Sequence, residues 1–137
     1  MKRDPRLRGL SSDHHRALVL ARRLARAGAA WARDDGLALG AQFDAELEPH
    51  FRVEEEVLLP ALRSAGASAL VERTLADHAA MRASVSVARA GDGAAARALG
   101  AQLLAHVRFE ERELFPACEA MLGEGILDDV VRRSARG

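Results

Sequence analysis

Apolar residues recur along the chain every three or four positions, which is the spacing of one helix face. Between residues 69 and 90, for example, Val71, Leu75, Met81 and Val85 fall on one face. Clusters that contain glycine interrupt this periodicity at 34–36, 64–68, 91–93 and 123–125. The pattern therefore predicts four helices, at about 11–32, 37–63, 69–90 and 94–121.

The short connections between these segments make neighbouring helices antiparallel. The predicted fold is therefore all-α, an up-down-up-down antiparallel four-helix bundle. Composition supports this class, because Ala and Leu together number 48 whereas Val, Ile and Thr number 11. We expect an N-terminal arm at 1–10, the bundle at 11–122, and a C-terminal tail at 123–137 that packs on the bundle through positions 126, 127, 130 and 131.

Three prolines interrupt the predicted helices. Pro49 lies inside the second helix, and Pro60 and Pro116 lie near the ends of the second and fourth. Proline lacks a backbone N–H and its ring clashes with the preceding turn. We expect each of these prolines to kink or end its helix.

Composition and charge narrow the class of protein. The 137 residues fit one domain, and 20 basic and 20 acidic side chains give zero formal charge. This balance argues against nucleic acid or an anionic membrane as a partner, and no apolar run reaches the roughly 18 to 20 residues that span a bilayer. Because the single cysteine, Cys118, cannot form an internal disulfide, we expect a cytoplasmic location. We expect the Cys118 side chain to lie in the core.

The sequence also repeats itself. Residues 50–62 read HFRVEEEVLLPAL and residues 106–118 read HVRFEERELFPAC, which agree at seven of thirteen positions without a gap. An Asp-His pair precedes each copy, at Asp13-His14 and at Asp77-His78. Two such helix pairs facing each other would form a pseudo-twofold bundle with the histidines near one axis.

Each predicted helix carries one histidine on its apolar face. In the second and fourth helices a glutamate follows one turn later on the same face, with Cβ atoms about 5–6 Å apart. In the first helix His14 faces inward, whereas His15 shares a face with arginines and is expected to face solvent. The inward set comprises His14, His50, Glu54, His78, His106 and Glu110.

This set predicts a metal site. An ionised carboxylate in an apolar core is strongly unfavourable without a partner, so two of them beside four imidazoles require positive charge between them. A single inward histidine is more often a hydrogen-bonded core residue, but one on every helix favours ligation. These ligand types suit iron, zinc or manganese better than calcium or magnesium. Glu55, Glu56 and Glu111 are expected at the rim, with a role as extra ligands as the alternative.

The levels of the histidines constrain the first helix. His14 precedes the first break by about 20 residues and His50 follows it by about 14, so straight helices would place them roughly 9 Å apart along the bundle. Either the first helix ends near Gly28 and a longer loop follows, or Trp31 and its neighbours overhang and close the end of the bundle.

These motifs resemble the hemerythrin-like HHE cation-binding domain family over nearly all of residues 10–120. The resemblance lies in Asp13-His14, Pro49-His50-Phe51, Glu54-Glu55, Asp77-His78, His106, Glu110-Glu111 and Pro116. It implies a non-haem di-iron centre with an oxo or hydroxo bridge, and zinc or manganese are the alternative metals. By position, the resemblance makes Glu54 and Glu110 bridging ligands and gives terminal ligation to His14, His50, His78 and His106.

One position departs from the pattern of the oxygen carriers in this family. Those proteins place a fifth histidine four residues after the third-helix histidine, where this chain has Arg82. With four imidazoles, two bridging carboxylates and a bridging oxygen, two coordination positions stay open on a pair of six-coordinate irons. Reversible oxygen storage is thus less firmly implied than metal binding itself.

The favoured interpretation is a metal protein that binds or reacts with dioxygen, nitric oxide or peroxide, for sensing, detoxification or iron handling, as a monomer or dimer. A di-iron oxidase or peroxidase-like enzyme is the first alternative, without a tyrosyl radical because the chain has no Tyr. A mononuclear zinc structural bundle and a metal-free interaction module are the others. The sequence identifies no protein partner.

Overall fold

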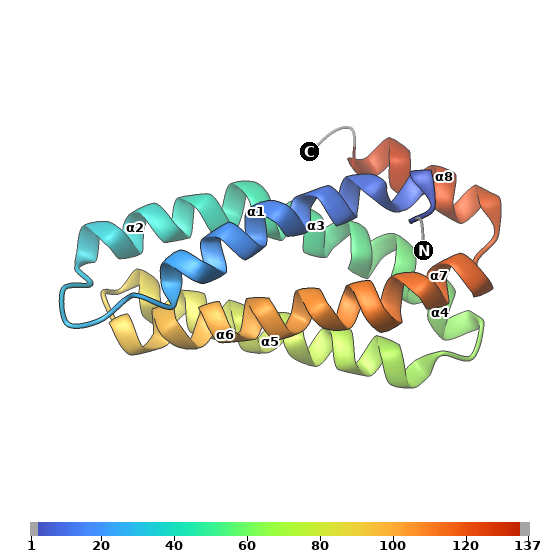
Figure 1. Cartoon of the computed structure of the whole chain (residues 1–137). Coiled ribbons are helices and arrows are strands. Elements are labelled where there is room, and N and C mark those ends of the chain that lie inside the picture. Colours follow the sequence, from blue (N-terminus) through green and yellow to red (C-terminus); the bar gives the residue numbers. More distant parts are fainter. Residues whose placement is uncertain (1–2, 135–137) are drawn as a thin grey trace.

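A computed structural model describes residues 3–134, and Figure 1 shows four long antiparallel helical rods packed along one another. No strand occurs among the described residues, so the predicted all-α bundle is confirmed. The first rod is the 3₁₀ turn η1 (Pro5–Leu7) and α1 (Arg8–Leu24), and the third is α5 (Ser68–Arg89). The second rod runs through α2 (Arg33–Gln42), η2 (Phe43–Leu47), α3 (Glu48–Val53), η3 (Glu54–Leu58) and α4 (Leu59–Ser64). The fourth consists of α6 (Gly93–Phe109), η4 (Glu110–Leu114) and α7 (Phe115–Met121), and α8 (Glu124–Ser134) follows.

The prediction that the first helix extends to residue 32 is wrong. α1 ends at Leu24, and the chain crosses to the second rod in an irregular segment before α2 begins at Arg33. Long-range hydrogen bonds hold this crossing, because Trp31 Nε1 donates to the Ala88 carbonyl at 3.2 Å and Arg97 Nη1 donates to the Ala27 carbonyl at 2.6 Å. The earlier helix end removes the mismatch between the levels of the first two histidines.

The prolines were predicted to kink or end their helices, and none of the three ends its rod. The second and fourth rods pass through all three prolines, and a five-residue π-helical segment precedes each one: η2 before Pro49, η3 before Pro60 and η4 before Pro116. In an α-helix the proline ring would clash with the carbonyl four residues earlier. That carbonyl lies in the middle of each π segment, where the wider turn accommodates the ring.

Two apolar clusters fill the bundle, one toward each end. The first cluster includes Leu24, Leu39, Phe43, Met81 and Leu99. The second includes Leu58, Leu62, Phe115, Cys118 and Leu127. A short polar layer lies where the two clusters meet, between them along the first and third rods and among their adjoining residues along the second and fourth. This layer is therefore enclosed above and below by apolar side chains.

The described part of the C-terminal segment packs on the bundle. In α8, Leu127 and Val130 are buried in the second cluster together with Leu7 and Leu10. Figure 1 shows α8 beside the N-terminal end of α1. The predicted tail extends to 137, but residues 135–137 lie outside the described part of the chain. Within residues 3–134, no helix combines the length and hydrophobicity needed to cross a bilayer.

Candidate metal centre

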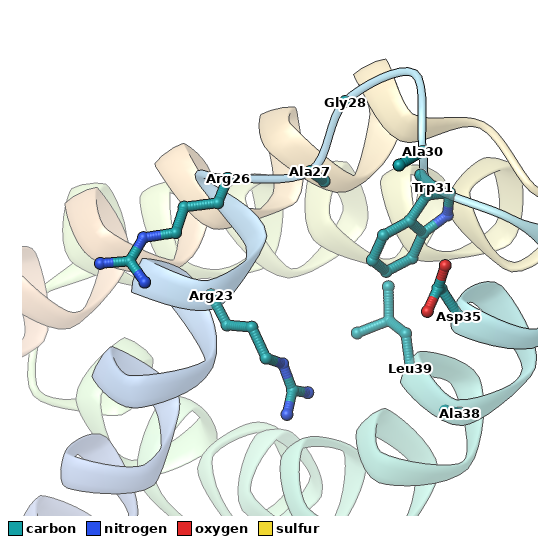
Figure 2. A pocket seen from close by; sticks show the side chains of 9 residues that line it. All are labelled: Arg23, Arg26, Ala27, Gly28, Ala30, Trp31, Asp35, Ala38 and Leu39. Atoms are coloured by element: carbon teal, nitrogen blue, oxygen red, sulfur yellow. The ribbon is translucent and has the colours of Figure 1, made fainter.

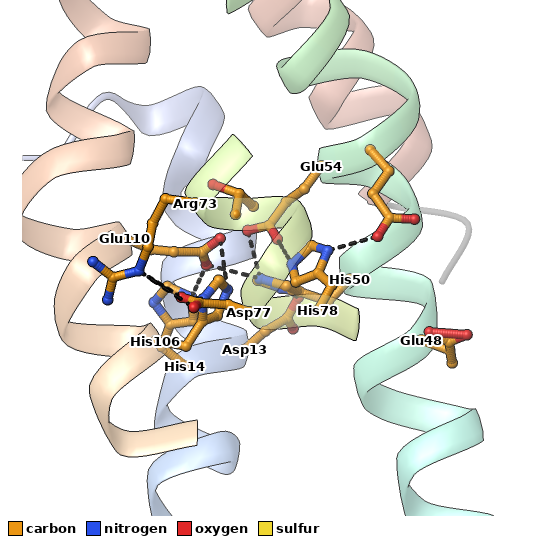
Figure 3. Close-up of polar contacts among 12 residues, drawn as sticks. Asp13, His14, Glu48, His50, Glu54, Arg73, Asp77, His78, His106 and Glu110 are labelled. Carbon is orange, nitrogen blue, oxygen red and sulfur yellow. Dashed lines mark hydrogen bonds and ion pairs between the residues drawn. The ribbon is translucent and has the colours of Figure 1, made fainter. Parts of the chain in front are cut away.

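All six predicted ligand residues meet in the polar layer between the two apolar clusters. Figure 3 shows the four imidazoles and two carboxylates converging from the four rods. Glu54 and Glu110 are completely buried, and none of the four histidines is more than 5% exposed. His15, by contrast, is exposed, in agreement with its predicted direction. The bundle thus collects into one site residues that are widely separated along the chain.

The six residues form two overlapping groups of potential ligands. His14 and His50 belong to one group, His78 and His106 belong to the other, and Glu54 and Glu110 belong to both. In each group one ligand atom per residue lies within 4.8 Å of all the others. Each group could hold a cation between two imidazoles, and the two groups share both carboxylates.

The Nε2 atom of every histidine faces the shared carboxylates. His14 Nε2 lies 2.8 Å from Glu110, and His50 Nε2 lies 3.0 Å from Glu54 and 3.5 Å from Glu110. His78 Nε2 lies 3.0 Å from Glu54. His106 Nε2 lies 3.1 Å from Glu110 Oε2, but within the described residues these two buried atoms have no hydrogen-bond partner.

The Nδ1 atoms face outward, and each donates to a carboxylate of its own. The His14 and His78 donors bond to Glu111 at 2.7 Å and to Glu55 at 2.6 Å. Asp13 accepts from His50 at 3.0 Å, and Asp77 accepts from His106 at 2.8 Å. A carboxylate that holds Nδ1–H fixes the ring and leaves the Nε2 lone pair directed into the core.

The sequence singled out Glu55 and Glu111 as rim residues and Asp13 and Asp77 as members of the Asp-His pairs, but it assigned none of them to a histidine Nδ1 atom. Each half of the chain contains one Asp-His pair and one Glu-Glu pair. In each Glu-Glu pair the first glutamate lies inside the layer, and the second accepts a hydrogen bond from a histidine Nδ1 atom. Glu55 and Glu111 are partly exposed at the edge of the layer, in agreement with the predicted rim position. The π turns of η3 and η4 begin at the inward glutamates, where both residues of each pair reach histidines.

The buried carboxylates of the layer favour positive charge beside them. Burial lowers the pKa of His106, but the charge of Glu110, the hydrogen bond to Asp77 and the charge of Glu54 together outweigh this effect and raise that pKa to about 10. Burial raises the pKa of Glu110, but the charge of His106 and hydrogen bonds from its neighbours hold it well below the usual value. Without a metal the surrounding carboxylates therefore raise the pKa values of His14, His50 and His106 and favour their protonated forms. A bound cation would occupy the same place between Nε2 atoms and carboxylates, and the unpartnered atoms of His106 and Glu110 fit that role.

Arg82 fills the place where the oxygen carriers have a fifth histidine, and it does not enter the layer. Its Nη1 and Nη2 atoms donate to the two oxygens of Glu55 at 2.8 and 3.1 Å, and its Nε donates to Glu48 at 2.7 Å. The guanidinium therefore contacts an outer carboxylate and not the Nε2 side of the site. Each cation position keeps two histidines.

Two hollows differ in their relation to this layer. A cleft of about 410 Å³ lies where α1 crosses to α2, and Figure 2 shows Arg23, Trp31 and Leu39 around it. None of its lining residues belongs to the layer. A smaller pocket of about 220 Å³, between α1, the second rod and α8, reaches Asp13 and His50. The hollow nearest the layer is thus the smaller one.

Fold and layer together define a helical bundle protein whose buried histidines and glutamates could hold metal. A model of one family, the hemerythrin HHE cation binding domain, matches residues 6–118, so the chain belongs to this family. Comparisons with curated proteins and with solved structures found no match. The family resemblance expected from the sequence is confirmed.

Proposed function

We propose that the protein holds two iron ions bridged by Glu54 and Glu110 and binds or reacts with dioxygen, nitric oxide or peroxide. The observation that carries this proposal is the arrangement of four inward Nε2 atoms around two shared, buried carboxylates. Each cation position would receive two imidazoles and one oxygen from each glutamate. Iron, when bound, would supply a redox-active Lewis acid with positions left open for a small ligand.

The residues around the layer support a small ligand over a bulky substrate. Apolar clusters enclose the layer on both sides, which keeps bulk water away and strengthens charge interactions inside. The pocket that reaches His50 has a volume of only about 220 Å³. The proposed role is sensing, detoxification or iron handling, and the proposed location is the cytoplasm.

Metal content per chain tests the proposal. The protein is produced with iron, purified without oxygen, analysed for metals, and then exposed to air while its absorption spectrum is recorded. We expect about two irons per chain and a new ferric charge-transfer band. One zinc and no colour would contradict the proposal and favour a structural zinc bundle, and sustained peroxide turnover by the iron form would identify an enzyme.

Adjacent histidines provide a matched control. The variant His14→Ala removes an inward imidazole, and His15→Ala removes an exposed one from the next position on the same helix. We expect His14→Ala to lose iron and the ferric band, and His15→Ala to retain both. Equal metal content in the two variants would contradict the assignment of His14 as a ligand.

A further inference from the structure

Each outer carboxylate also contacts an arginine. Arg16 and Arg73 contact the two aspartates, and their side chains are 64% and 48% exposed. Arg3 and Arg82 contact the two glutamates, and they are less exposed, at 19% and 36%. Because exposed ion pairs contribute little, the contacts of Arg3 and Arg82 are the ones able to fix a carboxylate.

Arg82 reaches His78 by two routes. Its fork binds both oxygens of Glu55, which accepts the Nδ1–H of His78 at 2.6 Å. The same guanidinium lies over the ring of Phe51, 5.4 Å from its centroid. Phe51 in turn stacks on His78, with ring centroids 3.9 Å apart and planes 13° apart. One side chain therefore supports both the polar edge and the flat face of this imidazole.

Arg3 makes the same pair of connections to His14. It donates to the carboxylate of Glu111 at 3.2 Å and to the backbone carbonyl of that residue at 2.9 Å, and Glu111 accepts the Nδ1–H of His14 at 2.7 Å. The Arg3 guanidinium lies 5.5 Å from the ring centroid of Phe115. Phe115 stacks on His14 at 5.3 Å with the planes 3° apart.

The two assemblies come from positions that do not correspond in the repeat. Phe51 aligns with Val107, and Phe115 aligns with Leu59. Arg82 lies four residues after His78 on α5, whereas Leu18 has that place after His14 and Arg3 precedes η1. The stacked arrangement of arginine, carboxylate, phenyl ring and imidazole is thus built at His78 and His14 from different parts of the chain. At His106, by contrast, the ring of Phe109 under Arg73 is tilted by 40° against the imidazole.

We propose that Arg3 and Arg82 are positioning residues for the two cation positions, Arg3 through His14 and Arg82 through His78. The inference rests on the proposed metal function. Arg3 lies outside the residues 6–118 that the family model matches, so the segment before the family domain completes one of the two positions. Without Arg82, Glu55 can turn toward solvent, and without Arg3, Glu111 keeps only the hydrogen bond from Ser11 beside that from His14. The Nδ1 edge of each histidine is then held less firmly, and the direction of its Nε2 lone pair is less well fixed.

The test measures ferrous iron affinity, anaerobically and against a competing chelator, for Arg3→Gln and Arg82→Gln. We expect each variant to bind one of its two irons about 10- to 100-fold more weakly than the wild-type protein, and the double variant to weaken both. Arg108→Gln is the matched control, because Arg108 is exposed on α6 and has no side-chain hydrogen bond or ion pair within the described residues. It should bind as the wild type does.

A second readout separates positioning from general stability. In zinc-loaded protein with nitrogen-labelled histidine, Arg3→Gln should shift the Nδ1–H resonance of His14 and leave that of His78 in place, and Arg82→Gln should do the reverse. Arg3→Lys should restore more affinity than Arg82→Lys, because lysine cannot reproduce the two-oxygen fork on Glu55.

Melting of the metal-free variants by circular dichroism checks that they fold. Iron affinities equal to the wild type in both glutamine variants, or identical shifts of both histidines, would overturn the inference while leaving the metal function intact. Failure of the wild-type protein to bind any metal would overturn the proposed function, and with it the positioning roles.

Discussion

At the scale of single residues, the structure separates three roles among acidic side chains that are neighbours in sequence. Glu54 is fully buried and faces two histidines, Glu55 accepts from His78 at the edge of the layer, and Glu56 is exposed and pairs with Arg133. The roles differ because the three side chains point in different directions from one π turn. Each direction gives a distinct expected effect of substitution.

Replacing both bridging glutamates tests the centre most directly. In Glu54→Gln combined with Glu110→Gln, we expect paired metal binding to be lost, because two neutral amides cannot balance two cations. The metal-free variant should be less stable than the wild type at neutral pH, since Glu110 helps to stabilise the charged form of His106 and its substitution breaks this buried pair. Iron analysis and thermal melting measure the two effects. Glu56→Gln is the control, and a double variant that still binds two irons would contradict the bridging role.

Cys118, in the second apolar cluster, allows a pH-dependent prediction. Burial, together with nearby carboxylates, raises the pKa of its thiol to about 12. An unfolded thiol has a pKa of about 8.5, so between these values the unfolded chain holds a reactive thiolate and the folded chain does not. We expect iodoacetamide at mildly alkaline pH to label the folded protein more than about 100-fold more slowly than the urea-unfolded protein. Comparable rates would show that the thiol is accessible.

At the scale of elements, close helix packing depends on residues without a side chain. A Cβ atom added at Gly36 in α2 would lie 2.6 Å from the backbone carbonyl oxygens of Ala88 and Arg89 at the end of α5. Backbone at a helix end cannot move aside as a flexible side chain can. The second and third rods therefore require glycine at this crossing.

The substitution Gly36→Ala should lower the free energy of unfolding by about 1–3 kcal/mol, which is typical of overpacking. Chemical denaturation of the metal-free protein measures this loss. Gly125→Ala, in the exposed first turn of α8 with no atom within 4 Å of the added Cβ, is the matched control. There alanine should be neutral or stabilising, because it favours a helix over the unfolded chain. A neutral Gly36→Ala would mean that the two rods are able to separate.

The π segments show how far local sequence determines an element. The three prolines indicated where the α-helical pattern must change, and the change does occur just before each of them. Whether a rod ends, bends or widens at a proline depends on packing on both sides. Leu58 and Leu62 are fully buried around Pro60, and this burial favours a continuous rod over an end.

At the scale of the whole molecule, the proposed cations connect all four rods. Each rod supplies one histidine, and the second and fourth also supply the shared glutamates. Ligands that bind only the folded protein stabilise it, by about 2.7 kcal/mol when the free ligand is at 100 times its Kd. Metal binding and folding should therefore be coupled.

Removal of the metal should lower the melting temperature by several degrees. Circular dichroism melts of the iron-loaded protein, with and without a chelator, measure this shift. The double glutamine variant at positions 54 and 110 serves as the control, and its melting temperature should not respond to iron or chelator. Equal melting temperatures of the loaded and stripped wild-type protein would contradict binding that spans the four rods.

The sequence by itself determined the helical class, the four rods and the six inward residues, because helix periodicity and the cost of buried charge are expressed over short distances along the chain. Only the tertiary structure decided where α1 ends, how the rods pass the prolines, and which carboxylate holds each histidine. Arg3 and Glu111, for example, are 108 residues apart. Contacts between such residues depend on the exact stagger and rotation of packed rods, which no local pattern specifies.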